Sequence, residues 1–259
     1  MSALEIAVAS RSELGRRKTN EDKVRVCREG ARWVAVLADG AGGHRNGAEA
    51  SKRAVDTLEA VLCGDDPPFT ATTLTRAVLA AHEGVQVAQD DAHGALRMHS
   101  TVVVLWLDVD GASVLWSHVG DSRLYRVRGG VATALTSDDS VVQRMVDADL
   151  ISAEQAESHP QRNQLIAALG IEEGVEPHTP PRPEMLFEGD AFLLCSDGWW
   201  DAFDEAAIAA TLRRSASPDE WLATMQHSIE DRALARQDNY SAIAVWVRDG
   251  IESTRPMLM

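Results

Sequence analysis

Four aspartates in this sequence stand where an apolar run meets a polar segment. They are Asp22 before the run 24–27, Asp39 after the run 33–38, Asp197 after the run 192–195, and Asp238 before the run 242–247. Each one alone is explained as a turn former, because Asp-Gly and Asp-Asn pairs are common in turns. If the runs are strands that share one end of a sheet, the four carboxylates would repel one another unless cations lay among them. Such a set of oxygen ligands favours Mg²⁺ or Mn²⁺ over Zn²⁺.

The elements that must position these residues follow from composition and periodicity. Segments rich in valine, tryptophan and leucine predict strands at 4–9, 24–27, 33–38, 101–107, 113–119, 124–128, 191–195 and 242–247. The pair Gly129-Gly130 predicts a hairpin turn. Apolar residues at helical spacing predict helices over 48–62 and 73–88, and a third that begins at Ser217. Strands that arrive as hairpins, with helices in separate blocks, favour an α+β fold over an alternating doubly wound sheet.

The segment from about residue 140 to 170 differs from the rest of the chain. Short helical pieces are expected at 141–146, 153–157 and 162–169, and no strand is expected. We interpret the segment as a helical insert that lies over the main domain. An extended connector with four prolines follows at 177–183.

The overall charge limits the partners of this chain. Its 259 residues carry a formal net charge of −15, which disfavours nucleic acid and anionic membranes as partners. The longest apolar run, 102–107, is far shorter than the ~20 residues that span a bilayer, and residues 1–9 do not resemble a secretory signal. The three cysteines, Cys27, Cys63 and Cys195, are odd in number and form no CxxC pair, so neither a disulfide framework nor a zinc site is expected. These features predict a cytoplasmic protein.

Five strings of residues, taken in order, resemble a known family. They are Arg17-Lys18-Thr19-Asn20-Glu21-Asp22, Ala38-Asp39-Gly40-Ala41-Gly42-Gly43-His44, His118-Val119-Gly120-Asp121-Ser122-Arg123, Cys195-Ser196-Asp197-Gly198 and Asp238-Asn239-Tyr240-Ser241. With the insert between the third and fourth strings, the chain resembles the bacterial metal-dependent serine/threonine protein phosphatases of type 2C (PPM) from about residue 10 to 247. The resemblance implies a four-layer α/β/β/α sandwich of two antiparallel sheets flanked by helix pairs, with a small helical flap at about 139–175. It also implies a single phosphatase domain over 1–248, and leaves 249–259 as a C-terminal tail that is a candidate for disorder.

The resemblance further implies a chemistry and a set of residues. In this family a water or hydroxide bound between two divalent ions attacks phosphorus directly, and no phosphoenzyme forms. The implied metal ligands are Asp39 as the bridging carboxylate, Gly40 through its carbonyl, Asp22, Glu21, Asp197 and Asp238, with Asp121 at a third, weaker ion. By the same resemblance, Arg17 binds the substrate phosphate, for which a planar guanidinium is suited. His44 is implied as the general acid for the leaving group.

Other interpretations of the same residues stay open. Arg17 is also a member of a basic run, His44 also fits a loop, and Asp121 also fits a turn in which it pairs with Arg123. The substitutions Ala41, Asp149 and Asp138-Asp139-Ser140 depart from the family's usual residues and leave flap conformation and substrate choice open. A dinucleotide-binding loop is disfavoured, because Arg45 stands where the third glycine should be.

Two functional alternatives remain beside a protein phosphatase. A regulatory, phosphoprotein-binding relative would have lost the carboxylates, all of which are present here. A phosphatase of small molecules is not excluded by the sequence. We expect a phosphorylated protein as the substrate, itself the target of a serine/threonine kinase, and Mn²⁺ or Mg²⁺ as two or three bound ions. We also expect a monomer that binds neither nucleic acid nor membrane.

Overall fold

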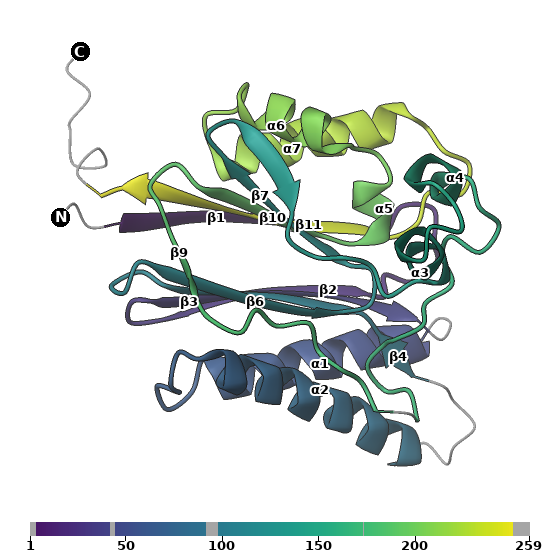
Figure 1. Ribbon diagram of the computed structural model, residues 1–259, viewed down its shortest axis with the longest axis horizontal. Coiled ribbons are helices and arrows are strands. Elements are labelled where there is room, and N and C mark those ends of the chain that lie inside the picture. The colour runs from purple at the N-terminus through teal and green to yellow at the C-terminus, as the bar shows by residue number, and fades with distance from the viewer. Residues whose placement is uncertain (1–3, 42–44, 92–97, 173, 251–259) are drawn as a thin grey trace.

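The structure is a computed structural model that describes residues 4–41, 45–91, 98–172 and 174–250. Its strands form two antiparallel sheets that lie face to face (Figure 1). The first sheet has the order β1(Leu4–Glu13), β11(Tyr240–Asp249), β10(Ala191–Cys195), β7(Arg123–Arg128) and β8(Val131–Ala134). The second has the order β2(Asp22–Glu29), β3(Arg32–Ala41), β5(Val102–Asp108), β6(Ser113–Val119) and β9(Glu184–Met185), and the short β4(His99–Ser100) pairs with the end of β3. The predicted α+β fold with two antiparallel sheets is confirmed.

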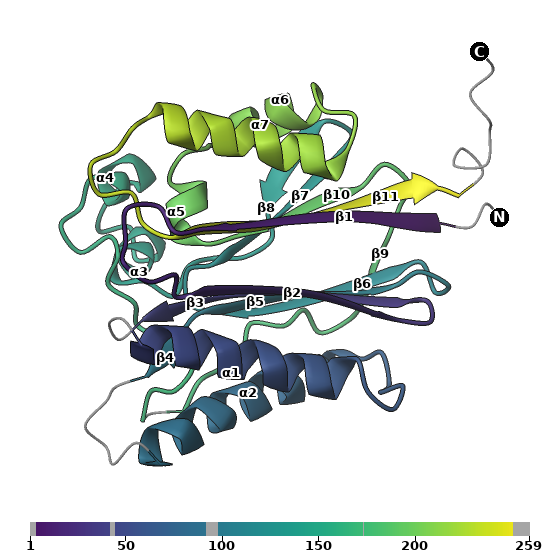
Figure 2. The same ribbon diagram turned by 180° about the vertical axis from the view of Figure 1, so that it is seen from behind.

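Helices cover the outer face of each sheet (Figures 1 and 2). α1(Arg45–Leu62) and α2(Ala71–Asp91) pack against the second sheet, and α6(Glu205–Leu212) and α7(Pro218–Asp231) pack against the first. α3(Val141–Asp147), α4(Ala153–Glu157) and α5(Asp197–Trp200) lie at the end of the sandwich where β10 ends. Within the described residues, no helix combines the length and the apolar character needed to cross a bilayer.

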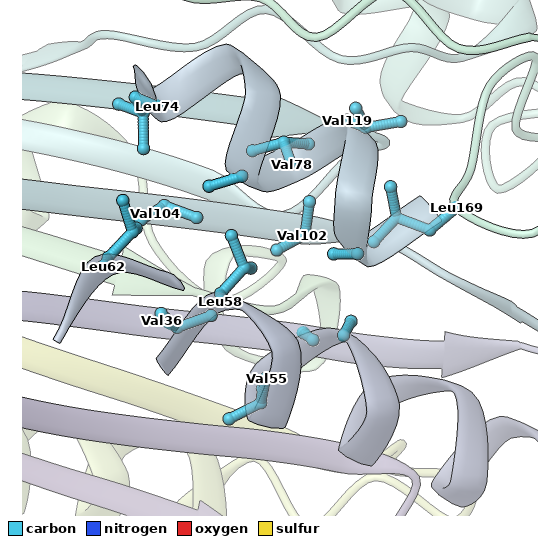
Figure 3. Packing of buried hydrophobic residues seen from close by; sticks show 14 of the residues in the cluster. Val36, Val55, Leu58, Leu62, Leu74, Val78, Val102, Val104, Val119 and Leu169 are labelled. Atoms are coloured by element: carbon cyan, nitrogen blue, oxygen red, sulfur yellow. The ribbon is translucent and has the colours of Figure 1, made fainter. Parts of the chain in front are cut away.

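Three buried apolar clusters hold these layers together, one between the sheets and one between each sheet and its helices. The cluster between the sheets includes Leu37, Val103 and Ile243. A second cluster joins the second sheet to its helices, and Figure 3 shows Val55, Leu58 and Leu62 of α1 and Leu74 and Val78 of α2 beside Val36, Val102 and Val104. Successive residues of β5 point alternately into these two clusters, so this strand is buried on both faces. That burial explains the continuous apolar run 102–107.

Most predicted elements are present, several of them with longer bounds. The pair Gly129-Gly130 joins β7 to β8 with φ of 57° and 80°, as a tight hairpin turn requires. The prediction missed β4, β9, α5 and α6, because such short elements show little periodicity. The helical piece expected at 162–169 is wrong, because this segment is irregular and Leu169 forms an isolated bridge with Ser100. The prediction for the tail 251–259 lies outside the described residues.

The expectation that the chain has no disulfide is also wrong. Cys27 of β2 and Cys63, one residue beyond α1, form a disulfide whose Cα atoms lie 6.7 Å apart. Both residues pack against the cluster between α1 and the second sheet, so burial of the surrounding side chains brings them together. The odd number of cysteines does not argue against this pair, because Cys195 is buried as a free thiol. The disulfide therefore ties α1 to the second sheet.

Candidate metal centre

The four aspartates lie at one end of the sandwich, two from each sheet. Asp22 opens β2 and Asp39 lies near the end of β3, where the two are direct cross-strand partners. Their carboxyl groups lie close enough for each to affect the pKa of the other. Asp197 opens α5 directly after β10, and Asp238 lies two residues before β11, the neighbouring strand in the first sheet. Ser196 links the two sheets here, since its Oγ donates a hydrogen bond to Asp22 Oδ2 at 2.9 Å.

The electrostatics of this group are those of crowded negative charges. Burial, followed by the charges of Asp22 and Asp197, raises the pKa of Asp39 well above its usual value. Burial, followed by the charges of Asp121 and Asp238, raises the pKa of Asp197 well above its usual value. Burial is also the main reason why the pKa of Asp22 is raised to about 6 and that of Asp121 to about 7. Because the neighbouring charges that act on Asp39 are those of carboxylates, the site attracts cations.

The donor atoms fit hard divalent ions. Asp22 is 2% exposed, and within the described residues its Oδ1 is buried without a hydrogen-bond partner. An orphaned carboxylate oxygen beside Asp39 is a ready cation ligand, and ligand sets made of oxygen suit Mg²⁺ and Mn²⁺. The four aspartates come from both sheets, two from each. Carboxylates that face one another from two sheets suit a pair of ions about 3.5–4 Å apart.

Two glycines allow the backbone to bring these residues together. A Cβ atom on Gly40 would lie 2.0 Å from the carbonyl oxygen of Gly47, so only glycine lets the first turns of α1 approach the end of β3. A Cβ atom on Gly198 would lie 2.1 Å from the carbonyl oxygen of Asn239. This second contact fixes the position of α5 against the loop before β11. Each of these glycines directly follows an aspartate of the centre, and at both places the neighbouring backbone leaves no room for a Cβ atom.

Several positioning residues were missed by the sequence analysis. The Asn239 side chain accepts a hydrogen bond from the Glu21 N–H at 2.9 Å and donates one to the Leu14 carbonyl at 2.9 Å. These bonds join the segment before β11 to the segment between β1 and β2. Thr101 Oγ1 accepts the N–H of Asp39 at 3.1 Å, and the Thr101 N–H donates to the Asp39 carbonyl at 2.8 Å. Asn239 belongs to the string Asp-Asn-Tyr-Ser, so its place beside Asp238 was a usable signal. Thr101 carries no comparable signal in the sequence.

The structure places two of the remaining predicted site residues beside the four aspartates and does not describe the third. Arg17 lies at the site, where its guanidinium donates to Asp238, and this contact raises the pKa of Arg17. Asp121 is 7% exposed and lies close enough to Asp197 for its charge to act there. The alternative in which Asp121 pairs with Arg123 is not what the structure has, because Arg123 donates to both oxygens of Asp138, at 2.9 and 2.7 Å. His44 lies outside the described residues.

Comparisons with known proteins identify the family of the chain. The profile of the family described as Protein phosphatase 2C matches residues 10–231. The serine/threonine protein phosphatase PstP of Mycobacterium tuberculosis is 37% identical over 211 residues, which cover 81% of this chain and 39% of PstP. Protein phosphatase PhpP of Streptococcus pneumoniae is 34% identical over 196 residues, which cover 72% of this chain and 76% of PhpP.

A solved structure of the PstP catalytic domain in complex with two manganese ions is also similar. Its TM-score is 0.81 at 30% sequence identity, and the match covers 95% of this chain and 100% of that one. The chain spans less than half the length of full PstP, so the similarity concerns the catalytic domain of that relative. The residues matched by the family profile include the whole second sheet and the first four of the five strings, and they end before Asp238 and β11. This chain belongs to the protein phosphatase 2C family.

Proposed function

We propose that this chain is a metal-dependent protein phosphatase that hydrolyses phosphoserine and phosphothreonine in proteins without a phosphoenzyme. The observation that carries the proposal is the group of carboxylates from both sheets, in which burial and then neighbouring negative charges raise the pKa of Asp39 and Asp197. Such a group is compatible with ionised side chains at neutral pH only when cations neutralise it. The family of the chain, and the two manganese ions in the PstP catalytic domain, support Mn²⁺ or Mg²⁺ in that role.

Each carboxylate has a distinct place in the proposed centre. The proposed ligands are Asp39 as the bridge between two ions, the Gly40 carbonyl, Asp197 and Asp238 for one ion, Asp22 and Glu21 beside the other, and Asp121 with Asp197 for a third, weaker ion. When bound, two such ions supply a water of lowered pKa and neutralise charge on the phosphoryl oxygens. The protein's own part is to hold the carboxylates in place, through Ser196, Asn239 and Thr101.

Arg17 is proposed to hold the substrate phosphate. Its side chain is 59% exposed, and the contact with Asp238 uses only Nη2 among its donors in the described residues. Because a guanidinium carries five N–H donors, others stay available for a phosphate that approaches from solvent. A phosphate bound to Arg17 would lie directly beside the carboxylate group. His44 is proposed as the general acid that protonates the leaving oxygen.

The other predictions for the chain also stay proposals. We interpret residues 139–175, which include α3 and α4, as a flap beside the site, and residues 1–248 as one phosphatase domain. The substrate is proposed to be a phosphoprotein made by a serine/threonine kinase, and the chain to act as a monomer. A cytoplasmic location is proposed as well, and the Cys27–Cys63 disulfide argues against it, because disulfides are unusual in that compartment.

Hydrolysis of a phosphothreonine peptide tests the proposal directly. Purified protein should release phosphate with added Mn²⁺ or Mg²⁺ and lose this activity when a chelator is added. Asp39→Asn is the matched control, because it keeps the size of the side chain and removes its charge. Absence of turnover at any divalent ion concentration, with an intact fold by circular dichroism, would contradict the proposal. Faster turnover of a small phosphate ester than of the peptide at equal concentrations would favour a phosphatase of small molecules.

A further inference from the structure

A second group of metal-ligand side chains lies beside the insert, and it contains histidine. His118 lies near the end of β6, Asp139 directly precedes the N-cap residue of α3, and His178 lies in the segment that leads to β9. One ligand atom from each of these residues lies within 4.8 Å of the other two. His178 Nε2 and Asp139 Oδ1 are 2.9 Å apart, and the two imidazole rings stack with centroids 4.8 Å apart.

The surrounding hydrogen bonds leave one ligand atom free on His118. Its Nε2 lies 2.8 Å from the carbonyl oxygen of Ser137, and a carbonyl only accepts, so this nitrogen carries the proton. The lone pair is therefore on Nδ1, which is buried and has no hydrogen-bond partner in the described part of the chain. His118 is 4% exposed, so water does not compete for this nitrogen. A histidine that donates one ring N–H to a carbonyl and keeps the other nitrogen free is the usual arrangement of a metal ligand.

Asp139 is oriented in a similar way. Its Oδ2 accepts the backbone N–H of Gly120 at 2.9 Å, and this bond turns Oδ1 toward His178. Zinc lies about 2.0–2.2 Å from nitrogen and oxygen ligands, so two ligand atoms of one tetrahedral ion lie about 3.3–3.6 Å apart. Asp139 Oδ1 and His178 Nε2 are now 2.9 Å apart, at hydrogen-bond distance, and would separate by about 0.5 Å to hold an ion. An ion could therefore replace the proton between these two atoms without a large movement of either residue.

We propose that His118, Asp139 and His178 form a binding site for Zn²⁺ that is separate from the carboxylate centre. Two imidazoles and one carboxylate are ligands that zinc prefers, whereas Mg²⁺ and Mn²⁺ prefer oxygen. The His178 side chain is 52% exposed, which gives the ion an entry path and leaves a position for water. When His178 binds the ion through Nε2, the proton that this nitrogen shares with Asp139 moves to Nδ1, so the ligand stays a neutral imidazole. The site contains no cysteine, so the argument from cysteine spacing does not bear on it.

The ion would tie the base of the insert to the second sheet. Asp139 and His178 flank the insert, and His118 and His178 already form an isolated bridge in which each N–H donates to the other's carbonyl, at 3.3 and 3.0 Å. An ion held by all three side chains would fix both ends of the insert against β6. Asp121 lies three residues beyond His118, so the ion would also restrict the strand end that leads to the proposed phosphatase centre. The binding site itself does not depend on that proposed activity.

Zinc binding measured with a surface variant tests this proposal. Zn²⁺ content is measured after equilibrium dialysis of the whole protein in excess Mg²⁺, which occupies sites made of oxygen ligands. We expect wild type to retain one Zn²⁺ equivalent more than His178→Ala, a variant of an exposed side chain that should not affect folding. Asp139→Asn keeps an acceptor for the Gly120 N–H and should weaken zinc binding more than the ~10–100-fold caused by loss of an outer-shell partner.

His227→Ala is the matched control. His227 lies in α7, 3.4 Å from Asp231, and is 76% exposed, so it is a histidine–aspartate pair without a second histidine. We expect this variant to bind as much zinc as wild type. In wild type, ¹⁵N signals of the imidazoles of His118 and His178 should shift when Zn²⁺ is added. Equal zinc content in wild type and His178→Ala, or imidazole signals that do not move at stoichiometric Zn²⁺, would overturn the proposal.

Discussion

Replacement of Gly198 by alanine tests whether close backbone packing positions the two aspartates of the first sheet. Gly198 follows Asp197 in α5, and a Cβ atom there would lie 2.1 Å from the Asn239 carbonyl oxygen. That is about 1.3 Å closer than ordinary van der Waals contact, which begins near 3.4 Å. Either α5 or the segment with Asp238 and Asn239 must therefore move by about 1 Å.

Two opposite effects determine the result for Gly198→Ala. Alanine is favoured over glycine inside a helix by about 1 kcal/mol, which would stabilise the variant. Overpacking costs about 1–3 kcal/mol, and a backbone carbonyl cannot rotate away, so the cost should be at the upper end. We expect the free energy of unfolding to fall by about 1–2 kcal/mol. A displacement of about 1 Å between Asp197 and Asp238 should lower kcat/KM by about 100-fold.

Urea unfolding and steady-state hydrolysis with saturating Mn²⁺ measure the two effects. Gly84→Ala in α2 is the control, because its Cβ atom would meet the hydroxyl of Thr57 at 3.2 Å, and a side chain can move. This control should keep full activity and gain up to about 1 kcal/mol of stability. If Gly198→Ala is as stable and as active as wild type, the close approach to Asn239 does not position the centre, and the reasoning is wrong.

The remaining predictions concern charge and covalent structure. Asp39→Asn should lower metal affinity by more than about 100-fold and abolish nearly all turnover. It should also raise the Tm of the metal-free protein, because one of the crowded charges is removed. An unchanged or lower Tm would contradict the repulsion between the carboxylates. Arg17→Ala should raise KM by about 10-fold or more with kcat nearly constant, while Arg16→Ala changes neither, and equal KM values would reject the phosphate contact. Replacement of both Cys27 and Cys63 by serine should lower the free energy of unfolding by about 2–4 kcal/mol in urea titrations without affecting kcat, and no loss would show that the disulfide is not formed.

The strands and long helices could be predicted because the spacing of apolar residues along the sequence follows which positions are buried. The run 102–107 is apolar throughout because β5 is buried on both faces, and α7 begins where Ser217 caps it. The order of strands in each sheet could not be predicted in this way, because it depends on pairs such as β1 with β11, which are far apart in the sequence. The disulfide was missed for the same reason, since Cys27 and Cys63 meet only after α1 packs on the second sheet.

In the candidate site, too, local signals could be predicted and contacts between distant segments could not. The aspartates could be found because each stands at the end of an apolar run, and the resemblance of the five strings placed them in one centre. The contacts that fix their positions could not be found, because a short distance such as that between Gly198 and Asn239 is a property of two packed segments. His118, Asp139 and His178 were also missed, since they come from three separate segments and form no string of their own.

The placement of the aspartates explains why cation binding should act on the whole sandwich. In the middle of the molecule the two sheets are joined by apolar contacts such as those of Leu37 and Ile243, whose burial favours association. At the end of the molecule, Asp39 from one sheet and Asp197 from the other oppose that association, since each raises the cost of ionising its neighbours. A divalent ion held at the proposed centre would convert this repulsion into attraction between the sheets. Its binding free energy therefore adds to the stability of the contact between the sheets, in addition to any chemistry that it supplies.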